Sequence, residues 1–317
     1  MTRQKTLKAT VRARMAATGE TYTKARASIL QTDASETDAT LLNATVRKVN
    51  QRSARIQFTG EDGEVTFRSA DVWRLVPGHS IVAQVQKRWT HRGHGYASGR
   101  VESERIDVAA LGLEPLPMDE LGAIDLASCH DPCEPSDRYA ALWQTLSSDP
   151  RPAVEFSAIA WQGRVAAESG DIQDCPITDA VELRDMGHAD DARQLLMELL
   201  HDDLRCIDAH AHLGNWEFDR NVKLALQHYE VGIRIGALSL PADEPDLLVP
   251  WSAVFNRPYL RCLHGYGLCL WQLDRLAEAE AVFERMLRLN PVDQLGARMC
   301  LFDVQDGKSW ADCADAE

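Results

Sequence analysis

The sequence lacks any long hydrophobic run. A membrane-spanning helix needs about 20 consecutive apolar residues, and no apolar run approaches that length, so a membrane protein is not predicted. The opening MTRQKTLKATVRARMAATGE also lacks the apolar centre of a secretory signal, and we expect no export. Its Arg and Lys residues suit a transit peptide, but the turn formed by Thr18, Gly19 and Glu20 interrupts a long amphipathic helix. We therefore expect a cytoplasmic protein.

The sequence also lacks paired cysteine spacings. Its eight cysteines are scattered, at positions 129, 133, 175, 206, 262, 269, 300 and 313. In a chain without a secretory signal, such cysteines are expected to be reduced thiols and not a disulfide framework. Cys262 and Cys269 stand seven residues apart, on one face of a predicted helix. A buried position is expected for both, because cysteine there behaves as a small apolar residue.

Motifs of catalysis are absent as well. The sequence contains no G-x-S-x-G, no H-E-x-x-H and no nucleophile with an evident base. Gly93 and Gly95 do not form a phosphate-binding loop, because no G-K-[ST] follows them. We predict that the protein is not an enzyme and has no cofactor. An active site assembled from distant residues is the alternative.

Two groups of metal-ligating residue types are incomplete. The stretch CHDPC, residues 129–133, supplies one close pair of cysteines, whereas a structural zinc site generally has two such pairs. A proline-containing turn is the simpler interpretation. His210 and His212 diverge on a predicted helix, because residues two apart do not share a face. His201 lies a turn or more away, so no metal site is expected.

The net charge of −14 conceals a division of the chain. Residues 1–107 hold 18 Lys and Arg against 11 Asp and Glu, a balance of +7. Residues 108–317 hold 16 against 37, a balance of −21. This division suggests different partners for the two parts. The alternative is that the basic part binds the acidic part of the same molecule.

Residues 1–31 are predicted to form a basic helical hairpin. Its first helix, about Lys5–Ala17, ends before Gly19, which can adopt the left-handed conformation that closes a helix. The second helix is expected at about Tyr22–Gln31. The stretch VRARMAATGETYTKARASIL resembles a short basic segment found at the start of assorted bacterial proteins. Its charge suits either nucleic-acid contact or a solvated docking helix, and a polar linker follows at 31–40.

After residue 40 the period of the sequence changes from helical to alternating. Apolar and polar residues alternate around Ala44, Ile56 and Ala83, which predicts β-strands. About five short strands fit within residues 41–107. Strands with one apolar face each need closure to hide their edges. We therefore predict a small all-β barrel of the OB or SH3-like kind.

One loop of the predicted barrel, WTHRGHGYASG at residues 89–99, suggests a function. Aromatic side chains stack on unpaired bases, and Arg or Lys neutralises phosphate. The candidate contacts to RNA or DNA are Lys87, Arg88, Trp89, Arg92 and Tyr96. Two alternatives remain open: the loop contacts a protein, or Trp89 closes the core and the glycines serve the turn.

Residues 108–170 are predicted to be an irregular connector with helices. The segments LGLEPLPMDELG and CHDPCEPSD are rich in proline and acidic residues. Helices are expected at Arg138–Leu146 and Ala153–Glu168. The aromatic anchors expected on their packed faces are Trp143, Phe156 and Trp161.

The stretch LHGYGLCLWQLDRLAEAEAVFERMLRLNP, residues 263–291, indicates two helices joined by a tight turn. Small and large residues stand where paired helices would touch, at Leu263, Tyr266, Gly267, Leu270, Ala279, Phe283 and Pro291. This pattern resembles the tetratricopeptide repeat. In that repeat Gly267 and Ala279 would let the helices approach, and Leu270 and Phe283 would fill the space between neighbouring pairs.

Two further stretches are similar to the same repeat. In GHADDARQLLMELL, Ala192 and Leu196 take the roles of Ala279 and Phe283; in the second stretch these are Ala225 and Tyr229, preceded by Leu213 and Gly214. Ala192 and Ala225 stand 33 residues apart, and 54 residues separate Ala225 from Ala279. The longer interval is one repeat with an insertion. The resemblance implies a C-terminal α-α array over residues 171–300, which would bind a protein partner.

The insertion, residues 238–258, holds four prolines and cannot be helical throughout. Long loops in compact domains are often functional, so we expect a lip over the binding surface of the array, or else a packed cover. The candidate partner-binding residues are Trp216, Arg220, Trp251 and Phe255. An acidic tail is expected at 301–317.

Together these features predict a multidomain α+β protein with a short basic helical N-terminus, a small all-β barrel and a C-terminal tetratricopeptide-like array. We expect an adaptor or scaffold. Its array would bind a protein partner, and the acidic balance favours a basic segment. Its barrel would contact nucleic acid. The alternative is a pure protein–protein scaffold without nucleic-acid binding, whose basic front docks on its own acidic back.

Overall fold

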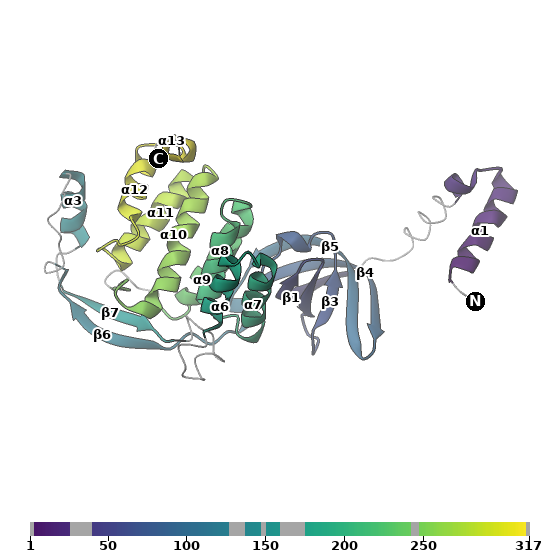
Figure 1. The fold of residues 1–317 in the computed structure, drawn as a ribbon, viewed down its shortest axis with the longest axis horizontal. Helices are drawn as coiled ribbons and strands as arrows, with labels where there is room; N and C mark the ends of the chain where they lie inside the picture. The colour runs from purple at the N-terminus through teal and green to yellow at the C-terminus, as the bar shows by residue number, and fades with distance from the viewer. Residues whose placement is uncertain are drawn as a thin grey trace.

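The computed structural model describes residues 3–25, 40–126, 137–146, 150–158, 175–241 and 247–314. Helix α1 (Arg3–Thr18) begins the chain and is drawn in purple in Figure 1. It ends as predicted, because Gly19 adopts a φ of +72° and its N–H donates to the Met15 carbonyl at 2.9 Å. The predicted second helix is present at residues 22–25, and its remainder and the linker at 31–39 lie outside the described residues.

Five strands close into a barrel in the order β1-β2-β3-β5-β4, which confirms the predicted small barrel. Their bounds are β1 (Thr40–Asn50), β2 (Ser53–Phe58), β3 (Val65–Arg68), β4 (His79–His91) and β5 (His94–Ile106). All pairs are antiparallel except β3 and β5, which run parallel. The 3-10 turns η1 (Val72–Arg74) and η2 (Ala109–Leu111) follow β3 and β5.

The alternation of apolar residues determines which side chains fill the barrel. The inward positions are Ala44, Val46, Ala54, Ile56, Phe58, Phe67, Ile81, Ala83, Val85, Ala97 and Val101, and all are buried. Because successive side chains of a strand point to opposite faces, their neighbours such as Arg55, Thr66 and Tyr96 face outward. The outer surface is therefore polar and aromatic.

The predicted connector contains a two-stranded sheet. Strands β6 (Met118–Ile124) and β7 (Arg151–Phe156) pair antiparallel. The prediction of a helix at Ala153–Glu168 is thus wrong over its described part, and the prediction of irregular structure at 111–122 is wrong where β6 begins. The backbone groups of β7 pair with β6 and with Leu248 instead of with one another. Residues 159–168, with Trp161, lie outside the described residues.

The insertion is anchored to this sheet. Leu248 exchanges backbone hydrogen bonds with β7, donating to Pro152 O at 2.8 Å and accepting from Val154 N at 3.0 Å. The buried amide of Asn256, in the 3-10 turn η5 (Val254–Asn256), donates to Val154 O and accepts from the Phe156 N–H. As predicted, the described part of the insertion is not a continuous helix.

Eight described helices form a C-terminal helical region, in green to yellow in Figure 1. They are α6 (Pro176–Asp185), α7 (Ala189–Asp202), α8 (Ile207–Glu217), α9 (Val222–Ala237), α10 (Arg257–Gln272), α11 (Leu276–Leu289), α12 (Ala297–Gln305) and α13 (Trp310–Ala314). Consecutive helices from α6 to α12 pack on each other, α8 also contacts α10, and α13 packs on α10. A further helix, α3 (Asp137–Leu146), confirms the prediction at Arg138–Leu146 and buries Trp143.

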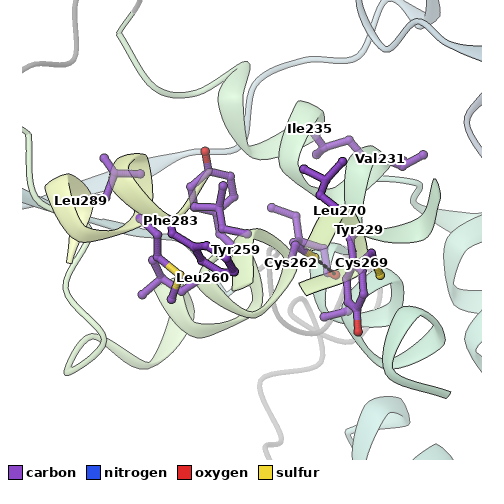
Figure 2. Packing of buried hydrophobic residues seen from close by; sticks show 14 of the residues in the cluster. Tyr229, Val231, Ile235, Tyr259, Leu260, Cys262, Cys269, Leu270, Phe283 and Leu289 are labelled. Carbon is purple, nitrogen blue, oxygen red and sulfur yellow. Dashed lines mark hydrogen bonds between the residues drawn. The ribbon is translucent and has the colours of Figure 1, made fainter. Parts of the chain in front are cut away.

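Glycines allow the helices of this region to pack closely. The Tyr229 ring of α9 lies against Gly214 of α8 and Gly265 of α10, where an added Cβ would stand 2.5 Å and 2.3 Å from ring atoms. Gly267 admits the Phe283 ring in the same way, at 2.6 Å. Figure 2 shows this cluster, in which Cys262 and Cys269 are both buried, as predicted. Side chains larger than hydrogen at these glycines would separate the helices.

The last described helices belong to the folded region. Residues 301–314, interpreted from the sequence as an acidic tail, include the end of α12 and all of α13. The Trp310 ring packs edge-on against Trp271 at a centroid distance of 5.3 Å and against Phe218 at 5.7 Å. Among the described helices, none has both the length and the apolar character that crossing a bilayer requires.

Candidate nucleic-acid interface

The hairpin of β4 and β5 carries all five residues proposed for nucleic-acid contact. Its two-residue turn places Arg92 at φ 51° and Gly93 at φ 77°. Left-handed conformations at both central positions are those of a type I′ turn, whose twist matches that of the flanking strands. The hairpin therefore stays paired to its tip, where His91 stands opposite His94.

Four outward residues form one row across four strands of the barrel. Arg55 of β2 stands opposite Thr66 of β3, Thr66 opposite Tyr96 of β5, and Tyr96 opposite Trp89 of β4. The Trp89 and Tyr96 rings stack at a centroid distance of 5.4 Å with planes only 10° apart. This row, Arg55–Thr66–Tyr96–Trp89, is called the aromatic row below.

Two cations flank the aromatic row. Arg68 of β3 and Lys87 of β4 stand opposite Ser98 of β5, one step along the strands. The Arg68 guanidinium lies 5.9 Å from the Trp89 ring centre and 5.5 Å from that of Tyr96, and the Lys87 ammonium lies 5.5 Å from that of Trp89. Both cations are exposed. They hold positive charge directly over an aromatic platform.

His94 contacts three of the four residues of the aromatic row. Its Nε2 lies 2.9 Å from the Thr66 hydroxyl and 3.5 Å from an Arg55 guanidinium nitrogen. Because arginine can only donate, Nε2 is the acceptor in the pair with Arg55. The His94 ring also meets Tyr96 edge-on at 4.9 Å. These contacts fix the orientation of the row.

The structure separates the five candidate residues of this hairpin. It brings Lys87, Trp89 and Tyr96 together, and it leaves Arg92 exposed at the turn. Arg88 points to the other side of β4, over the Phe58 ring at 4.7 Å, and both its terminal nitrogens donate to the Glu61 carboxylate. This pair lowers the pKa of Glu61 through the hydrogen bond from Arg88. The positive charge of Arg88 is thus already neutralised.

Sequence reasoning missed Arg55, Thr66 and Arg68. Their outward positions follow from the alternation of β2 and β3, and a hairpin between those strands would place Arg55 near Thr66. Their proximity to Trp89 and Tyr96 depends on the parallel pairing of β3 with β5. No local sequence signal marks that pairing.

The candidate partner-binding residues lie in separate places. Trp216 of α8 packs under the Arg184 guanidinium at 4.7 Å, and Trp251 lies beside Arg257 and Arg261 at 5.2 and 5.7 Å. A chain of contacts joins the two tryptophans across α8 and α10, through Arg261, Asp208 and His212. Phe255 is half-buried and donates its N–H to Glu155, and Arg220 is exposed in the turn after α8.

Asp208, in the middle of that chain, is fully buried. Burial raises the pKa of its carboxyl, although the charges of His212 and Arg261 oppose the shift. One carboxylate oxygen accepts from Arg261 at 3.2 Å. The contact holds α8 to α10 beneath the two tryptophans.

The histidines considered as ligands are used in packing. His210 and His212 diverge from α8, as predicted, since His210 meets His228 while His212 faces Asp208 and Trp216. His201 of α7 contacts Glu64 at 3.0 Å. Within the described ranges no group of three or more His, Cys, Asp or Glu side chains is arranged to hold a metal ion. The CHDPC stretch lies outside those ranges.

Comparison with protein-family models gives no match, and comparison with curated proteins finds no relative of this chain.

Proposed function

We propose that this protein is an adaptor without catalytic activity, which binds single-stranded nucleic acid on the aromatic row and a protein partner on its helical region. The observation that carries the first half is the stacked Trp89–Tyr96 pair with Arg68 and Lys87 over it. Stacking on aromatic rings and neutralisation of phosphates are the two interactions that retain unpaired strands.

The barrel architecture supports this proposal. A closed five-stranded barrel is compatible with the OB type, in which the face of strands 2 and 3 and the loop between strands 4 and 5 bind oligonucleotides. Arg55 and Thr66 lie on the corresponding face, and Arg92 lies in the corresponding loop. The residues and the face of the barrel thus favour the same ligand.

A single strand suits this surface better than a duplex. A base that stacks on the Trp89 or Tyr96 ring takes the place of the Arg68 guanidinium, which then moves to the adjacent phosphate. Paired bases in a duplex cannot present their faces in this way. Ser98, which stands opposite both cations, can donate a hydroxyl hydrogen bond to phosphate or base.

The helical region supports the second half of the proposal. Its helices pack in series, and the small residues of the tetratricopeptide pattern, Gly214 and Gly267, lie at helix–helix contacts. Helical arrays of this kind bind proteins on an extended surface. The chain of contacts between Trp216 and Trp251 marks where we propose that a partner docks. The balance of −21 over residues 108–317 favours a basic partner.

Binding of a fluorescent 15-nucleotide oligo-dT to the full chain, followed by anisotropy, tests the nucleic-acid half. Trp89→Leu is expected to weaken binding about 5- to 150-fold, because stacking of one base contributes about 1–3 kcal/mol. Arg68→Ala is expected to lower the slope of log affinity against log salt by about 0.7, the value for one phosphate of a single strand.

Arg88→Ala is the matched control for Arg68→Ala. Its guanidinium is already paired with Glu61 and lies off the aromatic row, so its affinity and salt slope should match those of the wild-type chain. If the wild-type chain does not bind oligo-dT at about 25 mM salt, where phosphate contacts are strongest, the nucleic-acid half is wrong. The pure protein scaffold would then be the better description.

A further inference from the structure

One acidic side chain, Glu64, lies beside the cationic end of the aromatic row. Glu64, directly before β3, contacts Arg55 at 3.2 Å, Arg47 of β1 at 3.9 Å and His201 of α7 at 3.0 Å. Its side chain is 22% exposed. Burial alone would raise the pKa of this carboxyl, but the hydrogen bonds and charges of His201 and Arg55 hold it below the usual value. Glu64 is therefore an anion in the folded protein.

Glu64 neutralises charge that a bound strand would use. Arg55 is the cationic end of the aromatic row, and Arg47 is the next arginine along the same side of the barrel. A carboxylate and a phosphate are both acceptors for the same guanidinium donors. A strand that extends from Trp89 past Thr66 must therefore displace Glu64 from Arg55 or leave that arginine unused.

The third partner of Glu64 belongs to a different part of the fold. His201 lies in the last turn of α7, within the helical region, and its Nε2 atom faces the Glu64 carboxylate. Both oxygens of the carboxylate lie within 3.1 Å of that nitrogen. Lys48 of β1 pairs with Glu198 one turn earlier on the same helix. Two ion pairs therefore connect this side of the barrel to α7.

We infer that Glu64 regulates nucleic-acid binding on the aromatic row by competing with phosphate for Arg55 and Arg47. His201 couples this competition to the helical region. This inference rests on the proposed function. Bound nucleic acid releases the two arginines from Glu64 and leaves the carboxylate to His201. A change in the position of α7, such as one that a protein partner imposes, changes how firmly Glu64 holds the arginines.

The variant Glu64→Gln tests the competition, because it keeps the size of the side chain and removes its charge. We expect oligo-dT to bind about twofold to thirtyfold more tightly, the range for release of two partly exposed ion pairs. The salt slope should steepen by about 1.4, since two cations become available to phosphate. Glu61→Gln is the matched control: it frees Arg88, which lies off the row, and should bind as the wild-type chain does.

Substitution of His201 tests the coupling. The affinity change that His201→Ala causes in the wild-type background should disappear in the Glu64→Gln background, because the histidine acts through the carboxylate. If wild-type protein binds oligo-dT and Glu64→Gln binds with the same affinity and slope, the inference is overturned and the proposed function stands. If neither protein binds at low salt, both are overturned. Equal effects of His201→Ala in the two backgrounds would remove the coupling alone.

Discussion

Among the residues that the structure describes, three histidines are buried without a compensating acid. His79 of β4, His210 of α8 and His228 of α9 are each at most 1% exposed. Burial, and then the charge of Arg74, lowers the pKa of His79 to about 4, and burial lowers that of His210 to about 3. Burial also lowers the pKa of His228 well below its ordinary value, and the adjacent His210 adds to the shift. All three are therefore neutral at physiological pH.

These pKa values predict acid sensitivity. The unfolded chain binds a proton at each histidine below about pH 6.5, and the folded chain does not until far lower pH, so stability is complete above pH 6.5 and falls below it. Between pH 7.5 and 5.5 the free energy of unfolding should fall by about 1.4 kcal/mol for each such histidine. Urea titrations at the two pH values measure this.

The variant His228→Gln should reduce the pH dependence by the contribution of one histidine. His188 is the control, because its side chain is 59% exposed; His188→Gln should leave the dependence unchanged. A stability that is the same at pH 5.5 and 7.5 would contradict the buried, neutral state of these side chains.

At the scale of elements, the Asn256 side chain shows how the sheet of β6 and β7 is attached to the insertion. Asn256 donates to Val154 O at 2.9 Å and Pro250 O at 3.1 Å, and it accepts from Phe156 N at 3.0 Å. Asn256→Ala would leave these buried backbone groups unpaired, so we expect a loss of about 2–4 kcal/mol in the free energy of unfolding. Hydrogen exchange of the Phe156 amide should accelerate in parallel.

Asn43→Ala is a suitable control, since Asn43 is an exposed side chain on the outside of β1. Its free energy of unfolding should change by no more than about 0.5 kcal/mol. If Asn256→Ala lost no more stability than Asn43→Ala, the insertion would not be anchored through this amide.

Apolar periodicity decides which elements can be predicted from the sequence. The strands of the barrel and the helices α7 to α11 have periodic apolar positions, and their predictions are confirmed. Strand β6 has no such signal, because its residues Asp119 to Ala123 are all exposed and only its backbone pairs. The site follows the same rule. Trp89 and Tyr96 are found within one hairpin, whereas Arg68 joins them only through the pairing of β3 with β5.

At the scale of the molecule, the barrel and the helical region share one apolar core. The cluster inside the barrel, with Val46 and Ile56, continues to Leu196 and Leu200 of α7 and to Ala209 of α8. The opposite charges of the two halves of the sequence suggested docking by ion pairs. Such pairs exist, between Lys48 and Glu198 for example, but they lie at the rim of this apolar contact. The apolar contact between α7 and the barrel cannot be predicted from the sequence. The same wide apolar face of α7 packs against both the neighbouring helices and the barrel.

A shared core predicts that the barrel loses stability when α7 is altered. Leu196 is fully buried between the two, and Leu196→Ala should cost about 2–5 kcal/mol, the range for truncation of a buried leucine. Hydrogen exchange of the amides of β1 and β2 should accelerate as much as that of α7, because both depend on the same contacts. The barrel and α7 would then be coupled through their shared apolar core as well as through the contact of Glu64 with His201.

Leu301→Ala separates this effect from general destabilisation. Leu301 is buried in α12, in the other large apolar cluster. Its truncation should accelerate exchange in α11 and α12 while the amides of β1 and β2 keep their protection, because those strands contribute no residue to that cluster. If Leu196→Ala also left β1 and β2 protected, the barrel would be stable by itself. A change at the helical region would then reach the nucleic-acid face only through the side chains of Glu64 and His201.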